Sequence, residues 1–391
     1  MDFTFGREDL ELQARARAFA EGFLFPAEAE VEETNGLSDA TRARIKRAVL
    51  DHGLNAINHS REDGGQGLSL VQQCLVAEEV GKATNMLGLL AWLPAQPLRL
   101  GTPGQKARYL RPACAGEKDE AFLVSEPHAG SDARAITTKA VKRGGRYVID
   151  GIKCFASGSE RADYLLVHAN VDGDPDKATL FLLDGRPRGY RVLKRPQAMF
   201  RSAFTNPWVA LEGVEADEDQ VLGKVGQGFE LTKDWFVEQR ANIGARAVGV
   251  AIRCAETAAA WARERRAFGR AIQEFQAIEF KLADMAVAIM AAKALVYRCA
   301  AEYDRGLDRK QAHARMAVVK LYCTEMAGRV ADEAVQILGG HGFMLDSPVA
   351  RHYQSVRAER IVEGTSEIQR AIIGGEIRKR GLGTYTGLMA G

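Results

Sequence analysis

The chain has 391 residues, of which 46% are hydrophobic and 27% are charged, as is ordinary for a globular protein with more than one domain. Its 53 basic and 51 acidic residues nearly cancel, and no apolar run reaches the length of a membrane span, so we expect neither a nucleic acid nor a membrane as partner. The first residues resemble no signal or transit peptide. The 6 scattered cysteines fit reduced thiols and the 7 histidines show no metal spacing, so we expect a cytoplasmic protein without a metal site.

Residues 7–111 have the pattern of a helical domain. Pro26 is expected to interrupt the first helix, and a second helix is predicted over residues 39–52. Ser69 and Gln72 form a capping box, which predicts the start of a further helix.

The pattern changes near residue 121, where the segments become short, rich in β-branched and aromatic residues, and separated by turns. Gly144-Gly145 and the loop 172–176 each lie between two such segments, and each predicts a hairpin. No stretch here is long enough for the helix of a parallel β–α–β unit, which argues against a doubly wound dinucleotide fold. We therefore expect a small antiparallel β domain. Strands are predicted at 147–149, 164–168, 179–183, 191–193 and 208–211.

After residue 228 the chain returns to helical patterns. Two long stretches carry apolar residues three and four positions apart, namely Phe275, Ile278, Leu282, Met285, Ile289, Ala292 and Val296, then Met316, Val319, Cys323, Met326 and Val330. This spacing indicates the buried seams of long antiparallel helices. We expect an α+β fold that is mostly α. Its parts are an N-terminal helical domain (1–120), a middle antiparallel β domain (121–225) and a C-terminal four-helix bundle (226–391).

Near the C-terminus, an acidic residue and a glycine stand directly before a predicted helix. Ser366 with Gln369 reads as a capping box, which places the helix start there. A helix N-terminus offers free N–H groups, and Gly364 allows a sharp bend and close approach of a ligand. Glu363 on the preceding loop is then a candidate general base, although a surface glutamate before an ordinary capped helix has the same pattern.

Two stretches of the β domain suit a flat, polar ligand. Residues 122–132 run from an apolar strand into a turn rich in small and hydroxyl residues. Residues 153–158 place the ring of Phe155 two positions before the hydroxyl of Ser157, which suits stacking and hydrogen bonding to a heterocycle. Ordinary turns at strand ends have similar compositions, so each stretch is weak evidence by itself.

Together and in order, these stretches resemble motifs of the acyl-CoA dehydrogenase family, over essentially the whole chain. The β-domain signature is matched by residues 125–132, and the flavin-edge motif by residues 155–157, with Phe155 in place of the commoner tryptophan. The other three motifs are Arg265-Arg266-Ala267-Phe268-Gly269 followed by Phe275-Gln276, Gln336-Ile337-Leu338-Gly339-Gly340-His341-Gly342, and Glu363-Gly364-Thr365-Ser366-Glu367. Five spaced motifs in one order make chance agreement very improbable.

The resemblance implies FAD as the cofactor. Ser157 would reach N5, the flavin atom that accepts hydride, and Ser131 would lie by the pyrophosphate. The residues implied to contact FAD within one chain are Ser125, Ser131, Phe155, Ser157, Thr365 and Glu367. In this family the adenine end crosses to a neighbouring subunit, where it would meet Arg265, Phe268, Gln276, Gln336 and Gly340. A shared site requires an oligomer, and the family suggests a homotetramer.

The resemblance also implies the reaction. Glu363 would remove a proton from the carbon next to the carbonyl of a fatty or other acyl-CoA, and hydride would leave the next carbon, which gives a trans-2-enoyl-CoA. The N–H of Glu363 and a ribityl hydroxyl of FAD would polarise the thioester oxygen. Electrons would then pass to an electron-transfer flavoprotein. Ser131, Arg240 and Gly364 would contact the substrate, and Val362 would shape the acyl pocket.

Some branches of the family take the base from the helix position directly before Arg240. Here that residue is Gln239, and Glu238 points about 100° away around a helix, so we expect Glu363 to be the base. The same scaffold also serves enoyl-CoA reductases and oxygen-using acyl-CoA oxidases, which the sequence does not distinguish. A DNA-binding flavoprotein, known from one branch, is disfavoured by the near-neutral charge.

Overall fold

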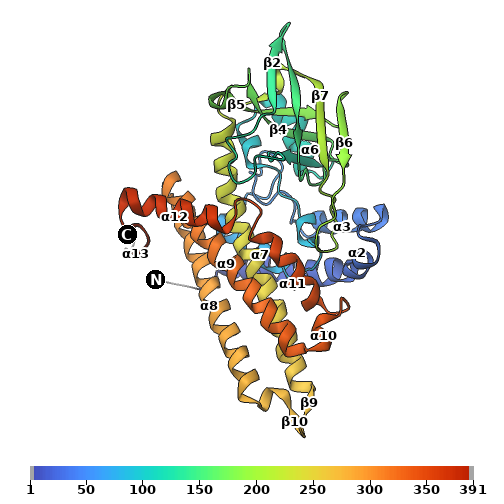
Figure 1. The fold of residues 1–391 in the computed structure, drawn as a ribbon, viewed down its shortest axis with the longest axis vertical. Coiled ribbons are helices and arrows are strands. Elements are labelled where there is room, and N and C mark those ends of the chain that lie inside the picture. The colour runs from blue at the N-terminus through green and yellow to red at the C-terminus, as the bar shows by residue number, and fades with distance from the viewer. Residues whose placement is uncertain (1–3, 387–391) are drawn as a thin grey trace.

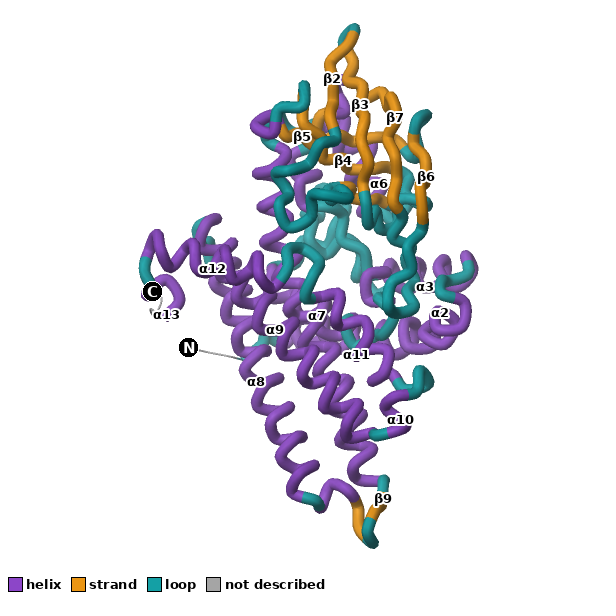
Figure 2. Tube along the Cα trace, in the orientation of Figure 1, coloured by secondary structure: helices purple, strands orange, loops and turns teal. Residues whose placement is uncertain are grey.

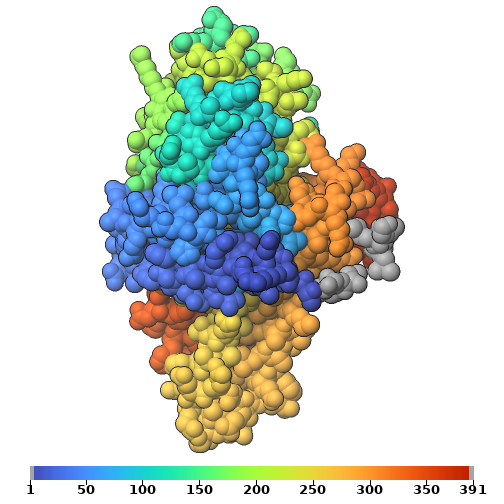
Figure 3. Space-filling view, turned by 180° about the vertical axis from the view of Figure 1, so that it is seen from behind, coloured from blue at the N-terminus to red at the C-terminus, as the bar shows by residue number. Residues whose placement is uncertain are grey.

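The computed structural model describes residues 4–386 and shows an elongated molecule with three regions along its long axis (Figure 1). A β domain forms one end, the C-terminal helices form the other, and the N-terminal helices lie across the middle (Figures 1 and 3). The predicted order of helical, β and helical regions is confirmed. Among the described residues, no helix is long and apolar enough to cross a membrane.

The N-terminal region consists of short helices, and Pro26 interrupts the α-helical winding as predicted, although the chain continues in a helical path. The chain passes from α1 through a π turn (Ala20–Leu24) and a 3₁₀ turn (Phe25–Ala27) directly into α2. Pro26 has no N–H to donate, and it lies where the hydrogen-bond pattern changes from the π turn to the 3₁₀ turn. The chain therefore stays helical but changes its helix type there. The predicted second helix and the capping box of Ser69 with Gln72 are confirmed. The helices are α1 (Arg7–Phe19), α2 (Glu28–Thr34), α3 (Asp39–Asp51), α4 (Leu70–Val80), α5 (Pro103–Gln105) and α6 (Arg111–Cys114).

The β domain holds one 8-stranded sheet with the order β6-β7-β3-β2-β4-β5-β8, and β1 pairs with β4. Both predicted hairpins are present, as β2–β3 and β4–β5. Gly144 and Gly145 have φ of 55° and 83° at the first turn, a conformation that favours glycine. The strands are β1 (Glu120–Leu123), β2 (Lys139–Arg143), β3 (Arg146–Lys153), β4 (Tyr164–Val171), β5 (Ala178–Asp184), β6 (Tyr190–Lys194), β7 (Trp208–Asp217) and β8 (Val221–Leu222).

The sheet is not wholly antiparallel, which corrects the prediction. Strand β4 pairs in parallel with both β1 and β2. Neither pair is joined by a hairpin, because a long loop or another strand separates its members along the chain. Such non-local pairing leaves no local turn signal in the sequence.

Long helices α7, α8 and α9 run side by side away from the β domain, and α11 packs on α7 and α9 (Figure 2). The predicted seams are buried at Met285, Ala292 and Val296 of α8 and at all five named positions of α9. Where α7 and α9 meet, a Cβ at Gly244 would lie only 2.5 Å from a methyl carbon of Val319, so the glycine permits the close packing. The elements are α7 (Gly228–Glu264), β9 (Arg266–Ala267), β10 (Arg270–Ala271), α8 (Gln276–Asp304), α9 (Arg309–Leu338), α10 (Gly340–Phe343), α11 (Pro348–Glu359), α12 (Ser366–Arg380) and α13 (Gly383–Thr386).

Candidate active site

The turn between α11 and α12 holds Glu363. Helix α12 begins at Ser366, but its N-cap is Thr365, whose hydroxyl accepts a hydrogen bond from the N–H of Ile368. The predicted capping role of Ser366 is therefore wrong by one residue, because Thr365 has the extended backbone that a cap requires. Ser366 is buried instead and donates to Glu325 Oε1 over 2.8 Å.

The backbone of this turn is unusual and firmly held. Glu363 and Gly364 have φ of 54° and 94°, a region that a glutamate rarely adopts. The carbonyl of Gly364 accepts hydrogen bonds from Lys320 Nζ and from Gln369 Nε2, each over 2.8 Å. A left-handed conformation costs a non-glycine residue about 1 kcal/mol or more, so these two bonds offset local strain and fix the turn.

Burial raises the pKa of Glu363 to about 7, although the cations of Arg240, Arg246 and Lys320 act in the opposite direction. The residue keeps some accessible surface, yet protein groups surround its carboxyl group, so the loss of hydration dominates. A carboxyl group with a pKa near neutrality can accept and release a proton at working pH. The structure thus gives the predicted base a suitable proton affinity.

Arg240, which the family resemblance implies as a substrate contact, lies beside the turn. Its Nε donates to the carbonyl of Glu363 over 3.4 Å, and its guanidinium lies 5.3 Å from the centre of the Phe236 ring. Burial lowers the pKa of His313 to about 4, so this neutral imidazole can accept a hydrogen bond from Arg240 Nη1 at 3.1 Å. Arg240 is therefore a positioned cation next to the base.

On α7, Gln239 and Glu238 lie as the helix geometry predicts. Gln239 lines a cavity, whereas Glu238 points away from it and accepts hydrogen bonds from Arg99 Nη2 and Asn58 Nδ2, each over 2.7 Å. Glu238 is engaged in this buried pair and does not reach the position of Gln239.

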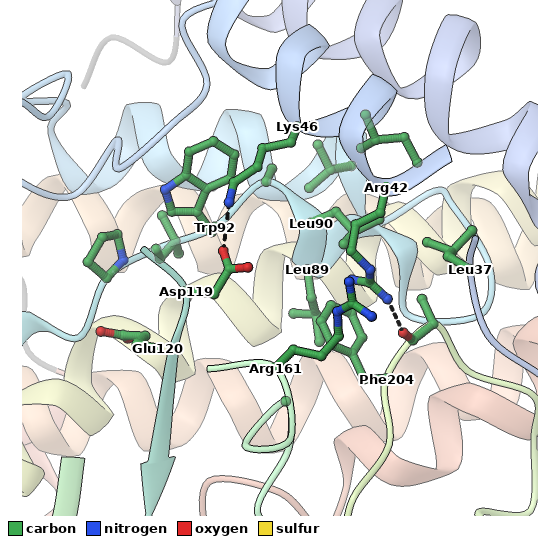
Figure 4. Close-up of a pocket in the computed structure, with 18 of the residues that line it drawn as sticks. Leu37, Arg42, Lys46, Leu89, Leu90, Trp92, Asp119, Glu120, Arg161 and Phe204 are labelled. Atoms are coloured by element: carbon green, nitrogen blue, oxygen red, sulfur yellow. Dashed lines mark hydrogen bonds and ion pairs between the residues drawn. The ribbon is translucent and has the colours of Figure 1, made fainter. Parts of the chain in front are cut away.

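A cavity of about 650 Å³ lies between α7, the segment 88–94, the start of α3 and the loops 158–161 and 203–205 (Figure 4). Its lining is mixed: Leu37, Leu89 and Leu90 stand among charged side chains. Arg42 and Arg161 point toward one another in it, and Arg42 Nη2 donates to the carbonyl of Ala203 over 2.9 Å. The cavity is large enough for the acyl part of a thioester.

The two predicted stretches of the β domain lie next to each other. The N–H of Cys154 donates to the carbonyl of Ser125 over 2.9 Å, which joins the loop of Ser125 to that of Phe155 and Ser157. Phe155 is 59% exposed and has φ of 55°, so its ring projects from the strand end. The hydroxyl of Ser157 is exposed and hydrogen-bonds to Asn206. An exposed ring beside an accessible hydroxyl fits the edge of a flat heterocycle.

Beneath these loops a buried ion pair fixes the backbone. Lys153 Nζ donates to Glu126 Oε1 over 2.8 Å, and both side chains are at most 1% exposed. The N–H groups of Thr137 and Thr138 donate to the same carboxylate over 2.7 and 3.0 Å. The cation and the hydrogen bonds lower the pKa of Glu126 to about 2 despite its burial.

The second group of predicted cofactor residues lies far from the first. Arg265 and Phe268 lie at the β9–β10 tip, at the opposite end of the long axis from the β domain (Figure 1). Phe268 is 95% exposed. All five members of this group face solvent, namely Arg265, Phe268, Gln276, Gln336 and Gly340. One chain therefore does not bring the two groups together.

Three family models match the chain in order: the N-terminal domain of acyl-CoA dehydrogenase over residues 6–117, the middle domain over 121–207 and the C-terminal domain over 226–377. The chain belongs to the acyl-CoA dehydrogenase family. The short-chain specific acyl-CoA dehydrogenase of Clostridium acetobutylicum is 32% identical, across 96% of this chain and 100% of that protein. A 3-(aryl)acrylate reductase of Clostridium sporogenes is also 32% identical, across 93% and 97%. Butyryl-CoA dehydrogenase from Megasphaera elsdenii has the same fold, with a TM-score of 0.90 and 29% identity across 97% of this chain and 100% of that one.

This acyl-CoA dehydrogenase is an oxidoreductase that uses FAD, as its family does. The residues of the chain fit that cofactor, because the exposed ring of Phe155 and the hydroxyls of Ser125 and Ser157 lie on adjoining loops. The start of α12 with its Thr365 cap adds the partial positive charge that suits an anionic group.

Sequence reasoning missed three residues close to the base. Lys320 holds the Glu363 turn, and Arg246 and Glu359 are near enough to change the proton affinity of Glu363. Lys320 and Arg246 carried a weak signal, since each is a lone basic residue within an otherwise apolar helical run. Glu359 stands four residues before Glu363 in a charged segment and carried none.

Proposed function

We propose that this acyl-CoA dehydrogenase converts an acyl-CoA thioester into the trans-2-enoyl-CoA, with Glu363 as the base. The observation that carries the proposal is a carboxyl group of pKa about 7 on a fixed turn, close enough to Arg246 to feel its charge, while Arg246 itself lines a cavity that fits an acyl group. Gln239 is the neighbouring residue of α7 that lines this cavity, and it cannot act as a base. Of the carboxylates that line the cavity, Asp39 and Asp119 are ion-paired and Glu120 accepts hydrogen bonds from Tyr164 and from the N–H of Ala95, so we assign the role of base to Glu363.

The backbone supports the polarisation of the thioester. Among the described residues, the N–H of Glu363 has no hydrogen-bond acceptor, so it is free to donate to the thioester oxygen. One donor of this kind stabilises a developing oxyanion by roughly 3–4 kcal/mol in other enzymes. Such stabilisation increases the acidity of the neighbouring C–H bond, and the carboxylate of Glu363 then takes the α proton. The β hydrogen leaves with its electron pair, and FAD, when bound, accepts that hydride.

The two groups of cofactor residues support an oligomer. In this proposal Ser125, Ser131, Phe155, Ser157, Thr365 and Glu367 contact the FAD of their own subunit, and Arg265, Phe268, Gln276, Gln336 and Gly340 contact that of a neighbour. Exposed apolar side chains on α8 support such contacts, since Phe280, Val287 and Met290 are 56%, 69% and 77% exposed. We propose a homotetramer, as in the family. Ser131, Arg240 and Gly364 would contact the substrate.

We further propose an electron-transfer flavoprotein as the acceptor and the cytoplasm as the location. The exposed Phe155 edge offers a route for electrons out of the flavin site, and 6 buried free cysteines suit a reducing compartment.

A panel of acyl-CoA thioesters tests the reaction directly. Each is mixed anaerobically with the FAD-loaded enzyme, and the oxidised flavin absorbance is followed. We expect rapid bleaching by at least one saturated thioester, and reoxidation by an electron-transfer flavoprotein faster than by oxygen. An enzyme that no saturated thioester bleaches would contradict the proposal.

The reverse reaction, reduction of a 2-enoyl thioester, is the second candidate. It is favoured by the similarity to the 3-(aryl)acrylate reductase. Chemically reduced enzyme that 2-enoyl-CoA reoxidises, combined with slow reduction by every saturated thioester, would support this direction.

A further inference from the structure

One wall of the cavity is polar. Gln239, Asn242 and Arg246 are three and four positions apart on α7, so they share a helix face, and all three line the cavity. Across from them the segment 88–94 contributes mainly apolar side chains, including Leu89. A cavity shaped only for a hydrocarbon chain would gain nothing from this wall, because unpaired polar groups are costly to bury.

Several polar atoms on this wall have no partner. Within the described part of the chain, Arg246 donates no side-chain hydrogen bond, and its Nε is buried. The nearest carboxylate is Glu359, whose Oε1 lies 3.7 Å from Nε, which is beyond hydrogen-bond distance, and whose Oε2 is buried and unpaired. The Oδ1 atom of Asn242 is also buried without a partner. These three atoms are closed off from solvent, so a ligand in the cavity could meet only the Nη groups of Arg246, whose side chain is 14% exposed and which make no hydrogen bond among the described residues.

The charge of the cavity indicates which kind of ligand. Five basic and three acidic side chains line it, namely Arg42, Lys46, Lys118, Arg161 and Arg246 against Asp39, Asp119 and Glu120. The acidic ones already have partners: Asp39 pairs with Arg161, Asp119 pairs with Lys46, and Glu120 accepts a hydrogen bond from Tyr164. The excess remains positive even when Arg246 is counted against Glu359, with which it forms a loose ion pair over 3.7 Å. A guanidinium binds a carboxylate through two parallel hydrogen bonds, which neither an alkyl group nor a hydroxyl can provide.

We infer that Arg246 binds a carboxylate on the acyl group, so that the preferred substrates are mono-thioesters of short dicarboxylic acids. This inference rests on the proposed function, because it assigns the acyl group to this cavity. Arg246 is close enough to lower the pKa of Glu363, and it lines the cavity to which the acyl group is assigned.

Binding of three matched thioesters tests the inference. Glutaryl-CoA, pentanoyl-CoA and 5-hydroxypentanoyl-CoA have acyl chains of the same length and identical CoA phosphates, so only the distal group differs. Calorimetric titration of the FAD-loaded Glu363→Gln enzyme measures their affinities without turnover. We expect glutaryl-CoA to bind at least tenfold more tightly than either of the others. Equal or tighter binding of pentanoyl-CoA would refute the inference, and so would equal binding of the hydroxy compound.

Variants then locate the carboxylate. In the same background, Arg246→Met should reduce the glutaryl preference at least tenfold, Arg246→Lys should retain part of it, and Arg42→Met should leave it within threefold. A preference that disappears with Arg42→Met but survives Arg246→Met would overturn the assignment to Arg246. If Arg246→Met fails to fold, as judged by FAD content and melting temperature, the Arg246→Lys variant still decides. Flavin reduction of the wild type is measured separately: failure with every thioester refutes the proposed reaction, whereas loss of the binding preference refutes only this inference.

Discussion

The two halves of the predicted flavin site differ in how completely one chain builds them. The half in the β domain and at the Glu363 turn is tied together by hydrogen bonds and a buried ion pair. The half at the β9–β10 tip is exposed, and within the described residues the guanidinium of Arg265 has no ionic partner. A motif whose contacts lie in the same chain is held in place before the subunits assemble. A motif that contacts another subunit remains exposed to solvent until they do.

The largest effect is expected from the base itself. Glu363→Gln removes the proton acceptor but keeps the size of the side chain, so the flavin-reduction rate should fall by about 10⁴-fold or more while FAD stays bound, as for a group that acts in the transition state. Stopped-flow absorbance measures the rate. Adding Gln239→Glu to this variant should restore part of the activity. A Glu363→Gln enzyme with near wild-type rates would show that another group is the base.

The next prediction tests whether the β-domain half of the predicted flavin site depends on its buried ion pair for stability. Glu126→Gln leaves Lys153 buried without a counter-charge, which should cost about 3 kcal/mol of unfolding free energy. The exposed pair partner Glu215 on the same sheet is the control, and Glu215→Gln should cost under about 1 kcal/mol. Urea denaturation compares the two. Equal losses would contradict the role of burial.

The ion pair also has a pH dependence. The pKa of Glu126 is held near 2, below its ordinary value of about 4.3, so its contribution to stability is present above that ordinary value and is lost as the pH falls through 2. Glu126→Gln should therefore flatten this part of the stability profile.

A smaller effect is expected at the tip. If Arg265 binds the FAD of a neighbouring subunit, Arg265→Ala should weaken FAD binding about 10- to 100-fold, in the range of one lost charge-assisted contact. The adjacent and equally exposed Arg266 is the matched control, and Arg266→Ala should change little. Fluorescence of released FAD and light scattering report the two quantities. A monomeric wild type that retains FAD would contradict a site shared between subunits.

The smallest effect concerns the cation behind the turn. The positive charge of Lys320 lowers the pKa of Glu363, so Lys320→Met should move the ascending limb of the rate profile to higher pH. We expect a loss of about three- to tenfold at pH 6 and little loss at pH 9, where Glu363 is ionised in both enzymes. The pH profile of flavin reduction measures this. A uniform loss at all pH values would indicate that Lys320 only holds the backbone.

Local signals in the sequence gave the correct prediction where the structure is also local. Gly144-Gly145 predicted its hairpin and Ser69 its helix start, because the side chains that decide these features are adjacent in the chain. The parallel pairing of β1 with β4 left no local signal. At the proposed base, the helix start after Glu363 was predicted to within one residue, and the capping residue was wrong by one position because the left-handed Gly364 resets the backbone.

The polar wall of the cavity shows what the sequence could not reveal. The spacing of Gln239, Asn242 and Arg246 was visible, yet nothing in one sequence says which face of a long helix meets a cavity and which meets another helix. Glu359 is a stronger case, since its relation to Arg246 depends on the packing of α11 against α7.

Arg246 has a further consequence for the length of acyl chain that the enzyme accepts. It lines both the main cavity and a chamber of about 30 Å³, together with Val80, Gly88 and Leu89, and so forms part of the partition between them. The backbone of α7 cannot move outward there, because it already packs closely on Gly81, the residue after α4, where an added Cβ would lie only 2.6 Å from the Cα of Arg246. The side chain is thus the adjustable part of that wall. We expect a smaller, neutral residue at this position to join the two spaces, so that this single position affects both the charge and the length of the pocket.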